Sequence, residues 1–125
     1  MNRFVALFCL FFVSACSSEI NLEKLSNWGT DDFSTEKWQS ANTEQRAKMV
    51  YQLLKRNKFV GKNPAEVRTI LGEPTGYYDY DSNLAYLVGK EGAANTVYAN
   101  TYMLVFVTDK EKTGNVVKVI TVPDL

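Results

Sequence analysis

The chain has 125 residues, with 14 basic and 14 acidic side chains and no histidine. A balanced charge without a basic run gives no electrostatic support for binding to nucleic acid. The lack of histidine removes the commonest general base near neutral pH and a frequent metal ligand. We therefore expect a protein that is not an enzyme, with no catalytic residue, metal, cofactor or small-molecule substrate.

Residues 1–15 have the pattern of an export signal. A basic start at Arg3 precedes an almost unbroken apolar run from Phe4 to Val13, and small residues follow at positions 14 and 15. The run is too short to span a hydrocarbon layer of roughly 30 Å, which needs about 20 apolar residues. This combination is typical of a signal peptide.

The end of this signal, Val13-Ser14-Ala15-Cys16, resembles a bacterial lipobox. The resemblance implies that Cys16 becomes the first residue of the mature protein and carries diacylglycerol, usually with a further acyl chain on its amino group. Two or three such chains anchor a protein stably, because each buried methylene contributes about 0.8 kcal/mol. The alternative is an ordinary signal peptide in which Cys16 is incidental, as Cys9 is. With Cys9 removed and Cys16 lipidated, no cysteine remains for a disulfide.

Residues 16–32 are mostly polar, and we expect them to form a lipidated tether ahead of a single domain at 33–125. Four apolar residues are scattered through the tether, of which Trp28 is the one we expect to pack against the domain. Ser34 is suited to cap a short helical turn that runs through Trp38.

The first long helix is predicted over residues 41–57. Asn42 and Gln45 have the spacing of a capping box, in which each side chain bonds the other residue's backbone N–H group. Apolar residues recur at helical spacing on one face, so the helix needs a partner to pack against.

A second, shorter helix is predicted within the stretch GKNPAEVRTILGEP, residues 61–74. Asn63 and Glu66 form another capping box, with Pro64 in the first helical position. The glycines could instead suggest a phosphate-binding loop, but neither G-x-x-x-x-G-K-[ST] nor G-x-G-x-x-G occurs here. We assign structural roles, at the boundaries of this helix, to Gly61, Gly72 and Pro74.

After residue 74 the pattern of apolar residues changes to that of strands. Strands are predicted at 77–88, 97–108 and 116–122, joined by polar connections that contain glycine. Helices followed by a meander of strands indicate the α+β class. We expect two helices packed on one face of a three-stranded antiparallel sheet, in the order ααβββ.

Tyrosine is concentrated in the first two predicted strands, and sheet packing accounts for most of it. A sheet covered on one side leaves its other face open, so some tyrosines there are candidates for binding a protein. The neighbouring acidic segment, Asp79 to Asn83, lacks the frame of a calcium loop, which favours a solvated turn. The candidate protein-binding residues are Tyr77, Tyr78 and Tyr80.

This combination of lipobox, capped helix and meander resembles the SmpA/OmlA family, also called BamE-like, of small outer-membrane lipoproteins. The resemblance covers roughly residues 60–123 and rests on Gly61-Lys62, Glu66-Val67, Leu71-Gly72 and Pro74, followed by the three strands. It implies an ααβββ fold, which also occurs in inhibitors that cap β-lactamases. The segment ahead of the first helix departs from the family pattern, so the family's partners are not carried over to particular residues.

Two functions follow as hypotheses. The resemblance implies a scaffold or accessory factor in outer-membrane assembly or maintenance, held in the outer membrane by lipid on Cys16 and facing the periplasm. Ser17, directly after the lipidated residue, fits sorting to the outer membrane. The alternative is a periplasmic protein-binding or inhibitory module that uses the open face of the sheet. Both hypotheses require an envelope protein as partner.

Overall fold

The computed structural model describes residues 20–89 and 101–125. The expected signal peptide, the expected lipidation site Cys16 and the first part of the strand expected at 97–108 lie outside these residues. In the described part of the chain, no helix has the length and hydrophobicity needed to cross a membrane.

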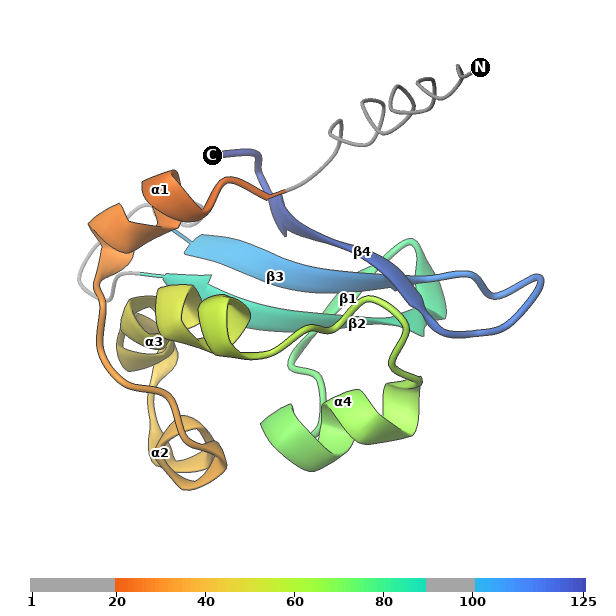
Figure 1. The fold of residues 1–125 in the computed structure, drawn as a ribbon, viewed down its shortest axis with the longest axis horizontal. Helices are drawn as coiled ribbons and strands as arrows, with labels where there is room; N and C mark the ends of the chain where they lie inside the picture. The colour runs from red at the N-terminus through yellow and green to blue at the C-terminus, as the bar shows by residue number, and fades with distance from the viewer. Residues whose placement is uncertain (1–19, 90–100) are drawn as a thin grey trace, which may run out of the picture.

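Helices precede an antiparallel sheet, as expected for the α+β class (Figure 1). The strands follow one another across the sheet in chain order, so the meander is confirmed. The sheet has four strands rather than three, because the first expected strand is a tight hairpin. The elements are α1 (Leu22–Leu25), the 3-10 helix η2 (Ser26–Trp28), α2 (Thr35–Ser40), α3 (Thr43–Arg56), α4 (Pro64–Leu71), β1 (Gly76–Tyr78), β2 (Tyr80–Gly89), β3 (Thr101–Thr108) and β4 (Val116–Val122).

The extra strand arises from a reversal of the chain at Asp79. This residue has a φ of 61°, in the left-handed region that aspartate adopts more readily than most residues. The reversal brings Tyr78 opposite Tyr80, and Gly76 opposite Ala85 further along the hairpin. The turn at Asp79 thus divides the single strand expected at 77–88 into two paired strands, β1 and β2.

The ends of the two main helices are those predicted from their capping residues. Asn42 and Asn63 each accept a hydrogen bond from the backbone N–H group three residues on, and both capping boxes are complete. Helix α4 ends at Leu71. It is followed by Gly72, whose φ of 80° suits glycine, and then by Pro74. Gly61 also has a positive φ, of 98°, just before α4. The structural roles assigned to these glycines agree with their conformations.

The core lies between the helices and one face of the sheet; Figure 1 shows α2, α3 and α4 on the same side of the strands. A row of aromatic rings runs through this core from the segment just before α2 to the loop after α3. Successive centroids lie 6.0, 6.2, 5.9 and 4.7 Å apart, which is the range of favourable aromatic pairs. The row consists, in order, of Phe33, Trp38, Tyr86, Phe106 and Phe59.

Trp38, the second ring of this row, also fixes α2 against α3. Its side chain is fully buried, and the Arg46 guanidinium lies 4.8 Å from the centre of the indole ring. The Arg46 Nε group donates a hydrogen bond of 2.9 Å to the Trp38 carbonyl oxygen. Burial lowers the pKa of Arg46 from its ordinary value. The short helix α2 therefore depends on tertiary contacts more than on its own six residues.

Part of the segment expected to be a tether belongs to the domain. Leu25 is fully buried in the core, and the ring of Trp28 lies 5.0 Å from that of Tyr102. The Asp31 N–H group donates a hydrogen bond to the Lys48 carbonyl oxygen at 3.0 Å. The boundary between tether and domain, expected at residue 33, therefore lies before α1, and Trp28 packs as the sequence suggested.

The leucines of α1 provide a test of this boundary. We expect Leu25→Ala to lower the free energy of unfolding by about 2–5 kcal/mol, as for other buried leucines. Leu22, which is 36% exposed on the same helix, is the matched control, and Leu22→Ala should cost much less. Urea unfolding of both variants measures the difference. Equal, small effects would mean that α1 is not part of the domain.

Tyr86 connects the sheet to the end of α4. Its ring is fully buried, and its hydroxyl donates a 2.8 Å hydrogen bond to the Gly72 carbonyl oxygen. Burial raises the pKa of the Tyr86 hydroxyl well above its ordinary value of 10.0. The fold thus holds the neutral phenol in an environment that disfavours the phenolate.

This shift predicts that the protein becomes less stable in alkali. Below pH 10 the Tyr86 phenol is protonated in both the folded and the unfolded chain. The stabilisation that comes from burying the neutral phenol is therefore fully present. Above pH 10 only the unfolded chain loses this proton readily, and stability should fall by up to about 1.4 kcal/mol per pH unit. Tyr86→Phe should remove this part of the slope and cost about 1 kcal/mol at neutral pH.

Unfolding by urea between pH 7 and 11 measures both effects, with Tyr80→Phe as the control because that ring is half exposed. A Tyr86→Phe variant with the same dependence on pH as the parent chain would contradict this account of the buried phenol.

Candidate protein-binding surface

The three candidate tyrosines lie on the β1–β2 hairpin, at one edge of the sheet. Tyr77 is 61% exposed and Tyr80 is 50% exposed, whereas Tyr78 is partly buried. The Tyr77 hydroxyl donates a 2.7 Å hydrogen bond to the Asp79 carbonyl oxygen, and the Lys110 ammonium lies 3.8 Å from the centre of the Tyr80 ring. Two aromatic rings are thus held at the surface in defined positions, as a protein-binding role requires.

In the acidic segment Asp79 to Asn83, beside these tyrosines, Asn83 of β2 forms hydrogen bonds to β1 and to β3. The Asn83 side-chain amide donates a hydrogen bond to the Tyr78 carbonyl oxygen, and its oxygen accepts one from the Thr108 N–H group, at 3.0 and 2.9 Å. This oxygen is therefore already engaged within the sheet. In the described residues, no group of three or more histidine, cysteine, aspartate or glutamate side chains is arranged to hold a metal ion.

The face of the sheet that points away from the core is lined with aliphatic side chains, and we call it the open face. Along one line across the sheet, Ala85 pairs with Val105, which pairs with Ile120; along the next, Leu87, Met103 and Val122 are paired in the same way. None of these side chains belongs to the core packed by the helices. The apolar residues of the open face are Ala85, Leu87, Met103, Val105, Val107, Ile120 and Val122, and Lys118, which pairs with Val107, projects on the same face.

The centre and rim of the open face differ in exposure. Ala85 and Val105 at its centre have no solvent exposure. The side chains around them are only partly buried. Met103 reaches across β2 toward β1: a Cβ atom at Gly76 would lie 2.9 Å from the Met103 sulfur. The lack of a side chain at Gly76 therefore leaves room for the Met103 side chain on the open face.

The tyrosine-rich open face expected from the sequence is instead aliphatic. Tyr86 and Tyr102 lie on the side of the sheet that faces the helices, where Tyr86 is fully buried and Tyr102 packs against the core. The sequence of β3 already indicated an apolar outer face, because residues on both sides of this strand are apolar. Such a strand requires cover on both faces, and the helices cover only one.

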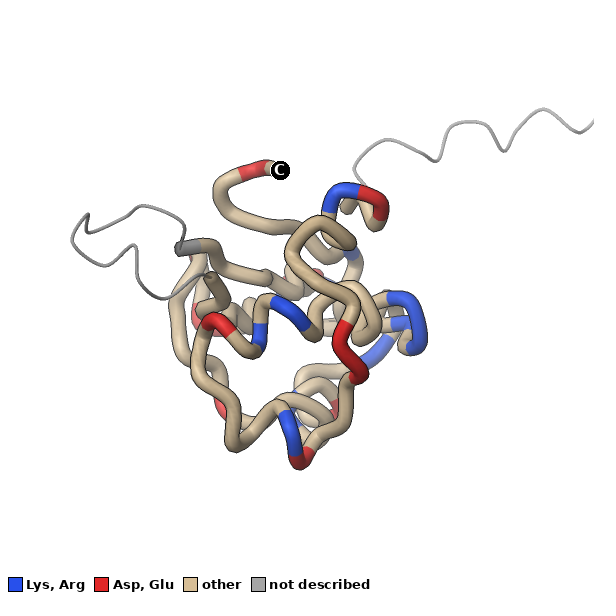
Figure 2. The backbone as a smooth tube through the Cα atoms, turned by 90° about the vertical axis from the view of Figure 1, so that its left-hand side faces the viewer, with Lys and Arg blue, Asp and Glu red and all other residues tan. Residues whose placement is uncertain are grey.

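Charged groups do not single out another binding surface. Acidic and basic segments lie next to each other along the chain, as Figure 2 shows for the face that it presents. The two ion pairs of the described residues, Arg56–Asp32 and Arg68–Glu73, have N–O distances of 3.2 Å and lie at the surface. Exposed pairs of this kind contribute little to stability. The open face differs from these charged regions, because it brings together partly buried apolar side chains from β2, β3 and β4.

Comparisons of the chain with protein-family models, with curated proteins and with solved structures gave no significant match.

Proposed function

We propose that this protein is a lipid-anchored, non-enzymatic lipoprotein of the bacterial envelope that binds another envelope protein through the open face and the hairpin tyrosines. Its place is the periplasmic side of the outer membrane, where it acts as a scaffold or accessory factor in assembly or maintenance. The lipobox-like sequence ending at Cys16 and the resemblance to the SmpA/OmlA family support the location and the general role.

The observation that carries the proposed binding is the open face. Soluble proteins seldom leave a large contiguous apolar patch uncovered, and such patches commonly mark interaction sites. The centres of protein interfaces are depleted in charge and enriched in methionine and aromatic residues. The open face offers Met103 among aliphatic neighbours. Tyr77 on β1 and Tyr80 at the start of β2 lie at the edge of the same sheet. The arrangement favours a protein partner over a small molecule.

The position of Cys16 would keep this surface near the membrane. Only residues 17–19 separate Cys16 from Ile20, the first described residue. A fully extended chain covers at most about 3.6 Å per residue, so Cys16 can lie no more than about 15 Å from Ile20. A short link of this kind favours partners that are themselves at the membrane surface. It makes a freely searching periplasmic inhibitor the less favoured alternative.

Photocrosslinking in the intact envelope of a two-membraned bacterium tests this function. A photoreactive residue in place of Ile120 on the open face should give one discrete crosslinked product. The same residue in place of Lys112, in the exposed β3–β4 connection, is the matched control and should give little product. Adding Tyr77→Ala and Tyr80→Ala to the Ile120 chain should reduce the product several-fold, because aromatic anchors often dominate interfaces.

Lipidation is tested in the same cells. Cys16→Ala should remove the lipid label, release the protein from the membrane fraction and lower the yield of the Ile120 product. Cys9→Ala should change none of these. Equal products from Ile120 and Lys112 would contradict the open face as the binding surface. If the parent chain carries no lipid, the proposed anchor is contradicted. The crosslinking from Ile120 then still tests the open face as a binding surface.

A further inference from the structure

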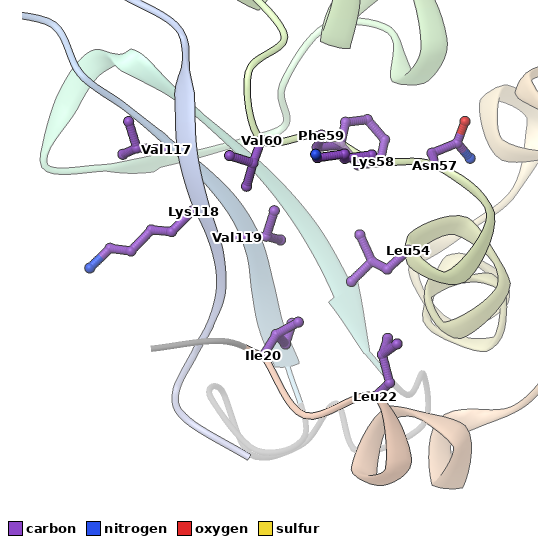
Figure 3. A pocket seen from close by; sticks show the side chains of 10 residues that line it. All are labelled: Ile20, Leu22, Leu54, Asn57, Lys58, Phe59, Val60, Val117, Lys118 and Val119. Atoms are coloured by element: carbon purple, nitrogen blue, oxygen red, sulfur yellow. The ribbon is translucent and has the colours of Figure 1, made fainter. Parts of the chain in front are cut away.

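A second apolar surface, a groove of about 550 Å³, runs beside β4 on the side of the sheet that faces the helices. Figure 3 shows side chains from three separate parts of the chain pointing into it: the segment before α1, the end of α3 with the following loop, and β4. Most of the lining is aliphatic or aromatic. The apolar residues that form it include Ile20, Leu22, Leu54, Phe59, Val60 and Val119.

The apolar lining is unusually open to solvent. Val60 is 47% exposed and Val117 is 48% exposed, and both belong to the small set of large apolar side chains that stand out at the surface. They lie at the same end of the groove, where Figure 3 shows Val60 close to β4. Leaving such side chains in contact with water is unfavourable in proportion to their exposed apolar area. A ligand that covers them therefore gains affinity from their burial.

The groove borders an unpaired strand edge. β4 is the last strand of the sheet and pairs with β3 on one side only. On its other side, Val116 exchanges two backbone hydrogen bonds of 2.8 Å with Gly61 and Lys62. Beyond Val116, the described part of the chain provides no further backbone partner for this edge. Gly61 and Lys62 thus pair with the start of the β4 edge as a neighbouring strand would. In the described residues, this pairing stops after Val116.

Two exposed lysines lie beside the groove. Lys58 and Lys118 both line it, and both are exposed. Within residues 20–89 and 101–125, neither forms an ion pair with a carboxylate. They come from different elements, the loop after α3 and β4. Figure 3 shows Lys118 pointing away from the groove, toward the open face, as its pairing with Val107 requires. Their charges are complementary to acidic side chains on an extended ligand.

We propose that this groove binds an extended segment of a partner protein, which adds as a strand to the free edge of β4. In such binding, main-chain hydrogen bonds provide affinity, and pockets for alternate side chains provide specificity. The segment has apolar residues at alternate positions, which enter the groove over Phe59 and Val119. Its remaining side chains include a carboxylate that reaches Lys118 on the opposite face of the sheet and another that reaches Lys58. This inference requires neither lipid on Cys16 nor a partner on the open face.

A labelled synthetic peptide provides the test. The probe has nine residues, alternating valine and threonine with a glutamate near each end, and it is titrated against the full chain in mild detergent by fluorescence polarisation. We expect saturable binding. Replacing both lysines, Lys58→Glu with Lys118→Glu, should weaken it by about tenfold or more. A peptide with lysines in place of its glutamates should show the reverse preference and bind the double variant better.

Further controls separate strand addition from other kinds of binding. Methylation of alternate peptide nitrogens, which removes main-chain donors, should abolish binding if the peptide adds to β4. Both lysines are exposed, so the double variant should keep the thermal midpoint of the parent chain. Three outcomes would overturn the proposal: no binding of the glutamate peptide, equal binding to parent and double variant, or undiminished binding of the methylated peptide. Sedimentation that shows β4-dependent dimers of the chain alone would assign the edge to a second copy instead.

Discussion

The row of aromatic rings centred on Tyr86 is the interaction on which the rest of the structure depends. Tyr86 lies between Trp38 of α2 and Phe106 of β3, and its hydroxyl holds the end of α4. Helices that are too short to be stable alone are thereby fixed to one face of the sheet. Because the chain is expected to have no disulfide after processing, this packing must determine which face of the sheet is covered.

Covering one face has a direct consequence for the other. The central strands carry apolar residues on both sides, as Leu104 and Val105 on β3 illustrate; both are fully buried, but they lie on opposite faces. A strand of this kind is typical of a sheet buried between two layers. In the described residues the second layer is absent, and the rim of the open face stays partly exposed. A partner protein would supply that layer, which is the physical basis of the proposed function.

Local chemistry made much of the helical part predictable. The capping boxes at Asn42 and Asn63 and the glycine at position 72 act within a few residues, so the sequence alone indicates where α3 and α4 begin and where α4 ends. A solvated turn was predicted at Asp79 to Asn83, but the chain turns at Asp79 alone, and Tyr80 to Asn83 belong to β2, where Asn83 is buried. This tight hairpin was not predicted, since a positive φ at a non-glycine residue has no strong sequence signal. The burial of Leu25 was missed because its contacts come from residues far along the chain. The same reason explains why the groove beside β4, which three distant segments form, could not be predicted.

The measurement that tests the central claim most directly is the reactivity of cysteines placed on the open face, in the native envelope and in purified protein. Ile120→Cys provides the probe, and Thr113→Cys, in the exposed β3–β4 connection, provides the reference. The account predicts that a water-soluble maleimide labels both positions in the purified protein, but that in the envelope only position 120 is strongly protected. Equal labelling of the two positions in the envelope would show that nothing covers the open face, and would contradict the claim.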